Sequence, residues 1–164
     1  MISRMKDFVG TWEMETQMTL KVLRALTPES LGQKVTPDGR SLGFLAWHLV
    51  TLIHHALDQV GLTTGGEMDD SSTTPPLDRI IAGWEDASRT LIEKIRPWGD
   101  NLDEPVNFYG RQLPRGRVLG GILAHVGHHR GQMTVLMRQA GLRVPGIYGP
   151  AKEDWASMGM PAHP

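Results

Sequence analysis

The sequence contains no cysteine. This absence excludes disulfide bonds, a cysteine nucleophile and thiolate metal sites, so that a bound metal ion must be held by nitrogen and oxygen ligands. Long apolar runs are also missing, because no stretch approaches the roughly 18 residues of a membrane-spanning helix. The first residues lack the apolar core of a signal peptide. We therefore expect a soluble, cytoplasmic protein with no membrane partner.

The sequence also lacks an excess of charge of either sign. The formal net charge is −1, and acidic and basic residues are interspersed along the chain. This balance provides no electrostatic footprint for nucleic acid, which is therefore not expected as a partner. The length of 164 residues suits one domain with its own hydrophobic core, so we expect a single domain over residues 1–164.

Apolar residues recur at helical spacing in four stretches. They predict helices over about residues 3–26, 41–60, 77–95 and 117–140. An all-α, antiparallel four-helix bundle is the simplest architecture that buries four such faces. Residues 98–116 form a long connection, of the kind that is usually functional or holds a short hairpin. Residues 142–164, which contain several prolines, are expected as a C-terminal arm laid over the bundle.

The predicted fourth helix carries three histidines within about one and a half turns. His125 and His129 lie one turn apart on its inward seam and can bind one ion, whereas His128 lies off this seam. Burial of two imidazoles costs free energy unless their nitrogens are bonded, and a divalent metal ion would offset that cost. The alternative is a metal-free core in which both rings are packed and hydrogen-bonded.

The predicted second helix offers a third ligand. His48 lies on the flank of its buried stripe, where a lone histidine is more often a core residue bonded to a carbonyl. His54 points elsewhere and is expected to be exposed. Three histidine ligands would leave a fourth position for water or substrate, as in catalytic zinc sites. Zinc and nickel are the expected metals, although imidazole also suits copper and ferrous iron.

Two segments resemble the DinB superfamily, also called the DinB/YfiT-like proteins. They are Leu45-Ala46-Trp47-His48-Leu49 and the run from Leu123 to Gln132, whose most specific part is His-x-x-x-His-Arg-Gly-Gln. The resemblance covers nearly the whole chain in helix order. It implies a four-helix bundle, often dimeric, with one metal ligand from the second helix and two from the fourth. In this sequence those ligands are His48, His125 and His129.

The same resemblance implies a class of reaction. Related proteins include transferases that use bacillithiol or mycothiol, and a mycothiol-dependent maleylpyruvate isomerase. The leading hypothesis is a metal-dependent transferase or hydrolase-like enzyme acting on a small molecule, with a low-molecular-weight thiol as the potential cosubstrate. The alternative is a non-catalytic, stress-responsive protein that binds a metal or another ligand and in which the metal stabilises the fold.

Several further residues are candidates around the ion. Gln132 and Glu15 could accept the second N–H of a ligand histidine. Arg130 could bind an acidic substrate, but a structural salt bridge is the more common role of such a residue. Thr16 and Thr19, which either line a cavity or bond their own backbone, would leave room beside the ion together with Ser88.

Small residues follow another face of the predicted fourth helix. They recur in steps of four, three and four at Gly120, Ala124, Gly127 and Gly131. Such a seam allows close approach of another helix. It fits a homodimer contact, and an intramolecular partner would explain it equally.

Overall fold

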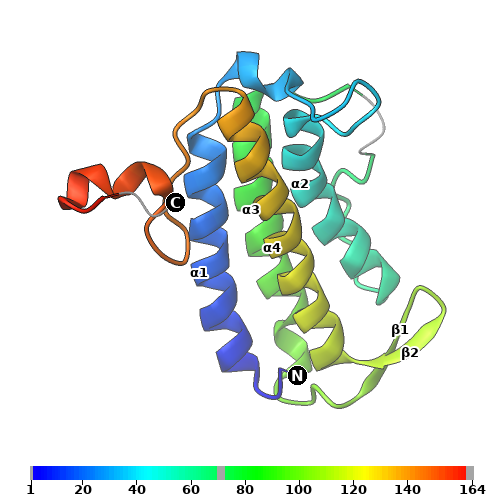
Figure 1. The fold of residues 1–164 in the computed structure, drawn as a ribbon. Coiled ribbons are helices and arrows are strands. Elements are labelled where there is room, and N and C mark those ends of the chain that lie inside the picture. Colours follow the sequence, from blue (N-terminus) through cyan, green and yellow to red (C-terminus); the bar gives the residue numbers. More distant parts are fainter. Residues whose placement is uncertain (1, 70–72, 162–164) are drawn as a thin grey trace.

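The computed structural model describes residues 2–69 and 73–161, and within them it contains four long helices and one β-hairpin (Figure 1). The helices are α1 (Met5–Arg24), α2 (Leu42–Gln59), α3 (Leu77–Ile95) and α4 (Arg115–Gln139). The short 3-10 helices are η1 (Pro28–Gly32), η2 (Arg96–Trp98), η3 (Lys152–Asp154) and η4 (Ala156–Met158). The four-helix bundle predicted from the hydrophobic spacing is confirmed.

Local signals account for the helix ends. The Ser41 hydroxyl accepts a hydrogen bond from the Phe44 amide at 3.0 Å and caps the start of α2. Pro76 and Pro114 precede α3 and α4, where a missing N–H costs nothing. After α2 and α4, glycines with positive φ end the helical conformation, at Gly61 with φ 79° and at Gly141 with φ 74°.

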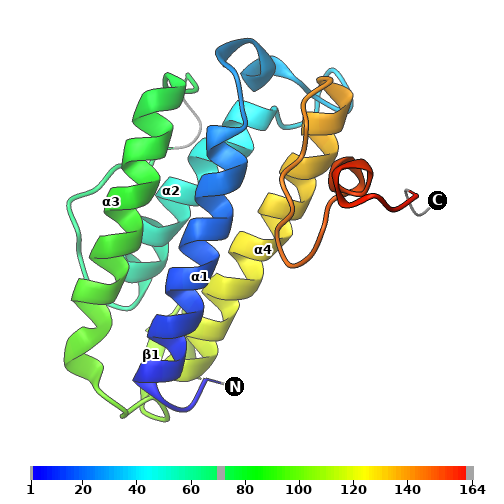
Figure 2. The same cartoon turned by 90° about the vertical axis from the view of Figure 1, so that its left-hand side faces the viewer.

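The bundle contains two parallel and two antiparallel neighbouring pairs (Figures 1 and 2). Helix α1 is antiparallel to α3, and α2 is antiparallel to α4, while α1 runs parallel to α4 and α2 runs parallel to α3. Helices α2 and α3 can run in the same direction because the connection between them passes back along the whole of α2. That distance is roughly 27 Å, the length of an 18-residue helix. The site-forming pair, α2 and α4, is therefore antiparallel.

The same connection covers one histidine of α2. His54 is 4% exposed, and its Nδ1 lies 2.8 Å from the Thr64 hydroxyl. Gly66 packs so closely against this ring that a side chain there would collide with it. The expectation that His54 is exposed is therefore wrong. The helical wheel places His54 on the outer side of α2, and the connection after α2 folds back over that side.

Residues 98–116 do hold a short hairpin. Strands β1 (Pro105–Phe108) and β2 (Arg111–Pro114) pair antiparallel, with Pro105 opposite Pro114 and Phe108 opposite Arg111. The two-residue turn has positive φ at both positions, 50° at Tyr109 and 75° at Gly110, as primed hairpin turns require. The hairpin extends beside the start of α4 and the end of α2 (Figure 1).

The C-terminal segment runs back along α1 and α4 before it projects away from the bundle (Figures 1 and 2). One ion pair ties it to the end of α4, and a second lies within the segment itself. Arg138 donates to Glu153 at 2.9 Å, and Arg143 donates to Asp154 at 2.8 Å. The described part of the predicted arm is therefore an ordered segment. Among the described residues, no helix combines the length and the apolar character needed to cross a membrane.

Candidate metal centre

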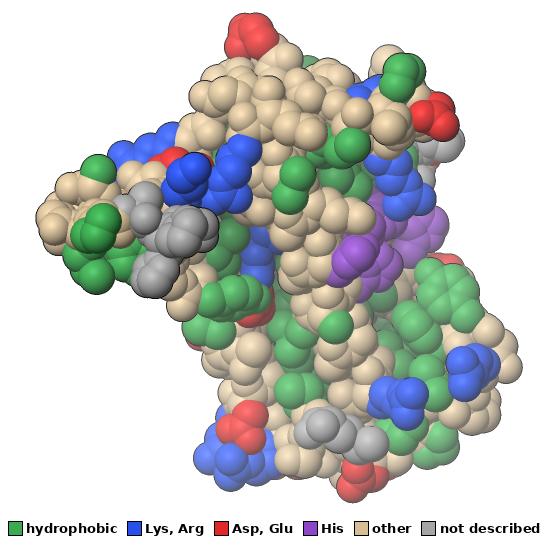
Figure 3. Space-filling model, viewed as in Figure 1, with side chains coloured by type: hydrophobic (Ala, Val, Ile, Leu, Met, Phe, Trp, Pro, Cys, Tyr) green, Lys and Arg blue, Asp and Glu red, His purple; other side chains and the backbone are tan. Residues whose placement is uncertain are grey.

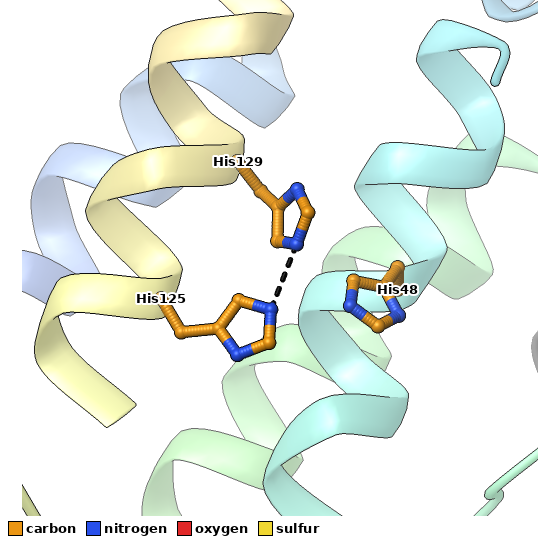
Figure 4. Close-up of side chains that lie close together, drawn as sticks. All are labelled: His48, His125 and His129. Carbon is orange, nitrogen blue, oxygen red and sulfur yellow. Dashed lines mark hydrogen bonds between the residues drawn. The ribbon is translucent and has the colours of Figure 1, made fainter. Parts of the chain in front are cut away.

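Histidine side chains gather on the face of the molecule where α2 lies beside α4 (Figure 3). Three of them converge: His48 from α2, and His125 and His129 from successive turns of α4 (Figure 4). Each offers one ring nitrogen, and these three atoms all lie within 4.8 Å of one another. The structure thus brings together the three histidines that were predicted to bind one ion.

Hydrogen bonds orient the two rings of α4. The Nδ1 of His129 lies 2.8 Å from the Gln132 side-chain oxygen, which can only accept, so that this nitrogen carries the hydrogen. The Nε2 of His129 then has a free lone pair and accepts from the Nε2 of His125 at 2.8 Å. Gln132 therefore plays the predicted role of an acceptor that fixes the tautomer and direction of a candidate ligand.

The three rings differ in exposure. His129 is 4% exposed, His48 is half-buried and His125 is exposed. The prediction that His125 occupies a core position is therefore wrong. The His125 side chain lies at the outer edge of the interface between α4 and α2, where solvent reaches it. His48 also stacks on Phe44, with ring centroids 5.9 Å apart and planes inclined by 9°. One side of the histidine cluster is enclosed and the other is open.

A pocket of about 310 Å³ adjoins the open side of the cluster. His48 and His125 form part of its wall, and the hairpin closes another part with Phe108, Tyr109 and Leu113. The volume lies at the lower end of the roughly 300–1,000 Å³ that small-molecule sites span. A small molecule in this pocket would contact the exposed histidine directly.

The donor set fits a divalent metal ion. Imidazole is a good neutral ligand for zinc and nickel, and burial keeps the pKa of His129 low enough for the ring to be neutral at pH 7. Nitrogens bound tetrahedrally to zinc at about 2.0–2.1 Å lie roughly 3.3 Å apart. The observed spread within 4.8 Å is close enough for side-chain rotation to reach this geometry.

Comparisons with known proteins identify the family of the chain. The model of the DinB family matches residues 1–162. The uncharacterized protein YrdA of Bacillus subtilis is 42% identical over 164 residues, which cover 99% of this chain and 98% of YrdA. The chain belongs to the DinB family. The crystal structure of a DinB-like protein from Bacillus cereus is 40% identical and superposes with a TM-score of 0.85, covering 90% of this chain and all of that one.

A more distant DinB-like structure shares the fold of this DinB-family chain. The crystal structure of YjoA from Bacillus subtilis is 14% identical, with a TM-score of 0.68, and the match covers 88% of this chain and 99% of that one. At this identity the likeness concerns the fold alone. The bundle therefore persists where most of the sequence has changed.

Glu15 and Arg130 of this DinB-family protein form a salt bridge away from the histidines. Arg130 donates to a Glu15 carboxylate oxygen at 2.5 Å, and the two side chains are 1% and 8% exposed. A second guanidinium nitrogen donates to the Thr19 hydroxyl at 3.1 Å. The structural interpretation of Arg130 is thus confirmed. Glu15 does not accept from a candidate ligand, because it faces the side of α4 that contacts α1.

Thr16 and Ser88 do not lie beside the candidate ion. They line a groove of about 700 Å³ between α1 and α3, and none of the three histidines is among its described lining residues. Thr19 bonds its own backbone, donating to the Glu15 carbonyl at 3.0 Å. The predicted cavity is therefore misplaced, since the histidines face the α2–α4 side of the bundle.

Sequence reasoning missed the aromatic contacts that shape this DinB site. Phe44 lies one turn before His48 on α2, and that spacing was a signal for a shared face. Phe108 and Tyr109 carried no comparable signal, because a two-residue hairpin turn reaches the histidines only through the path of the chain. Tyr148, which lies on the other side of α4, was missed for the same reason: its hydroxyl donates to Glu15 at 2.8 Å from the C-terminal segment.

The metal-free DinB protein is expected to lose stability as the pH falls. Burial, partly opposed by the bond to Gln132, lowers the pKa of His129 to about 4 from 6.5. Below pH 6.5 the unfolded chain binds a proton on this ring, whereas the folded chain binds one only near pH 4. The free energy of unfolding should therefore fall by about 2–3 kcal/mol on this account between pH 7 and pH 4.5.

Urea denaturation with a chelator at both pH values measures this loss. Other groups also titrate in the range, so the relevant quantity is the difference between wild type and His129→Gln. The variant lacks the titrating ring and should lose correspondingly less stability on acidification. Equal losses in the two proteins would show that His129 does not titrate with a depressed pKa.

Proposed function

We propose that the protein binds a divalent metal ion through His48, His125 and His129 and acts as a metal-dependent enzyme on a small molecule. One observation carries the proposal: three histidine nitrogens converge beside a pocket, and two of the three rings, those of His48 and His125, line it. Three protein ligands and an open position are typical of catalytic rather than structural zinc sites. Zinc and nickel are the metals that we expect.

The chain's own residues would prepare this site for chemistry. When bound, zinc or nickel supplies Lewis acidity at neutral pH. Gln132 holds the Nδ1–H of His129 and directs its other nitrogen toward the cluster. The apolar wall of the pocket excludes water from one side of a bound molecule, which strengthens electrostatic interactions there.

Thiol transfer is the specific reaction that we propose. The sulfur of a low-molecular-weight thiol would form a bond to an electrophilic carbon of the second substrate, the thiol would lose its proton, and the leaving group would depart with the bonding electrons. The family resemblance supports this class of reaction. A cytoplasmic location would supply the thiol in reduced form, since disulfides rarely persist there.

The competing function is non-catalytic. In that case the ion would mainly tie α2 to α4, because its ligands come from both helices, and its binding free energy would stabilise the folded state. The buried, hydrogen-bonded His129 favours such a role. The exposed His125 beside the pocket favours the catalytic one.

Activity and stability measured together separate the two functions. Purified protein is assayed for consumption of an electrophile with several low-molecular-weight thiols, with and without a chelator, while the melting temperature is recorded. If the protein is an enzyme, turnover should depend on the thiol. The chelator and His125→Ala should abolish this turnover, and His128→Ala should retain it. A chelator that lowers the melting temperature without changing activity across the thiols would favour the structural role.

The functional unit that we propose is a homodimer formed through the small-residue face of α4. A Cβ atom added at Gly120 or Gly131 would meet no other atom within 4 Å, which leaves room for a second copy at these two positions, while a Cβ atom at Gly127 would lie 4.0 Å from the Tyr148 hydroxyl. Light scattering should give the mass of a dimer, and Gly131→Glu should shift it toward a monomer by placing a charge on the face. A monomer at high wild-type concentration contradicts the dimer.

A further inference from the structure

We infer that the pocket beside the histidines selects a small anionic molecule with an apolar body, such as an aryl or alkyl carboxylate, and that Arg117 binds its anionic group. This inference rests on the proposed function, because it names the substrate class of the same site. It follows from the pocket's lining, from its charge and from the spacing of residues along α4.

The walls of the pocket suit an apolar body. Six side chains from α2, the hairpin and α4 supply hydrocarbon surface: Leu52, Ala56, Phe108, Leu113, Val118 and Ile122. Apolar surface removed from water contributes roughly 25 cal/mol per Å² to binding. The polar groups lie at defined places in this wall, which is the usual arrangement of a specific small-molecule site.

The charge of the pocket favours an anion. Arg117 lines it, and none of the lining residues that the structure describes is acidic. Among residues 2–69 and 73–161 no carboxylate forms an ion pair with Arg117, so its guanidinium has donors available for a ligand. Three neutral imidazoles would also leave the charge of a divalent ion uncompensated, which again favours an anionic ligand.

The spacing on α4 sets the orientation of the ligand. Arg117, Gly121 and His125 are four residues apart in turn and therefore share one face, with about 12 Å of helical rise between the first and the last. Gly121 leaves the space between them empty, because a Cβ atom added there would meet no other atom within 4 Å. A ligand lying over Gly121 can place its anionic group at Arg117 and its other end at the histidines.

The hairpin turn contributes an aromatic wall at some conformational cost. Tyr109 lines the pocket and has φ 50°, in the left-handed region that a non-glycine residue enters at a cost of roughly 1–2 kcal/mol. Its ring packs edge-on against Phe108, with centroids 4.8 Å apart. Strained residues of this kind cluster at ligand sites, where the surrounding structure holds them in place.

Binding of simple probes to the zinc-loaded protein tests the charge preference. Phenylacetate and benzoate are titrated by calorimetry and compared with their neutral amides, phenylacetamide and benzamide. We expect the carboxylates to bind at least tenfold more tightly than the amides. Arg117→Gln should weaken carboxylate binding about tenfold and leave the zinc content unchanged, whereas Arg111→Gln on the hairpin should change neither.

A second pair of variants tests the location without removing a charge. Gly121→Leu fills the space between Arg117 and His125, and leucine is a better helix former than glycine, so the fold should be retained. This variant should lose carboxylate binding and keep its zinc and melting temperature. Gly10→Leu makes the same change at an exposed position of α1 with open space around it and should bind normally.

The outcomes distinguish this inference from the proposed function. Carboxylate binding that depends on Arg117 and persists in zinc-free His125→Ala would show that the pocket binds the anion without the ion, and negligible zinc in the wild type would then reject the metal centre while the inference stands. Binding that chelation abolishes, but that Arg117→Gln and Gly121→Leu leave intact, would mean that the carboxylate coordinates the ion alone, which overturns the inference. Absence of saturable binding of both carboxylates at millimolar concentration would overturn it as well.

Discussion

Replacing His129 by alanine is expected to abolish stoichiometric binding of zinc or nickel. His129 is the most enclosed of the three candidate ligands, and its Nε2 lies 2.8 Å from the Nε2 of His125. Loss of a partner that merely orients a ligand costs about 10- to 100-fold in metal affinity. Loss of one of three protein ligands should cost considerably more, and metal analysis of the dialysed protein measures it.

Two matched variants give this result its meaning. Gln132→Ala leaves all three imidazoles in place but removes the acceptor of the His129 N–H, so it should weaken metal binding about 10- to 100-fold. His128→Ala removes a neighbouring ring that lies outside the converging group and should bind metal as the wild type does. Equal and negligible metal in wild type and His129→Ala would refute the metal centre.

Replacing Arg130 by methionine is expected to lower the free energy of unfolding by about 3–5 kcal/mol. The substitution would leave the Glu15 carboxylate buried without its cation, and it would remove the bond to the Thr19 hydroxyl. Arg130 also donates to the Tyr148 hydroxyl, which connects the C-terminal segment to the bundle. Urea denaturation at pH 7 measures the loss.

Two comparisons test whether burial is the cause. Arg138→Met breaks the pair with Glu153, in which the arginine is 43% exposed, and should cost about 1 kcal/mol or less. The double variant Arg130→Met with Glu15→Gln removes both charges and should recover part of the stability that Arg130→Met loses. A cost for Arg130→Met no larger than that for Arg138→Met would contradict a buried, stabilising network.

Local sequence predicted the parts of this protein that depend on neighbouring residues. Helix boundaries follow from apolar spacing and from caps such as Ser41 and Gly141, which act within one or two turns. The pairing of His125 with His129 also follows from one helical turn. His48 could be proposed as the third ligand from its place on the flank of the predicted second helix, and the resemblance to the DinB superfamily implied the same pairing of two helices that lie far apart in the chain.

Features that depend on the path of a loop could not be predicted in this way. His54 has a position on the wheel of α2 that suggested exposure, yet the connection after the helix covers it. Thr16 on α1 and Ser88 on α3 do line one groove, as predicted, but this groove lies between α1 and α3 and does not contact the histidines. In each case helical periodicity predicts the face on which a residue lies, but it does not predict which segment packs against that face.

The sequence by itself determined the four helices, the histidine pair on one face of α4 and the absence of any cysteine thiolate ligand. Only the tertiary structure decided that His129 is enclosed while His125 is exposed, that Arg130 pairs with Glu15, and that a hairpin makes a pocket with Arg117 beside the histidines. The physical reason is the separation, along the chain, of the residues that interact. Helical periodicity and capping act between residues a few positions apart, whereas burial, ion pairing and pocket shape depend on which distant segments the connections bring into contact.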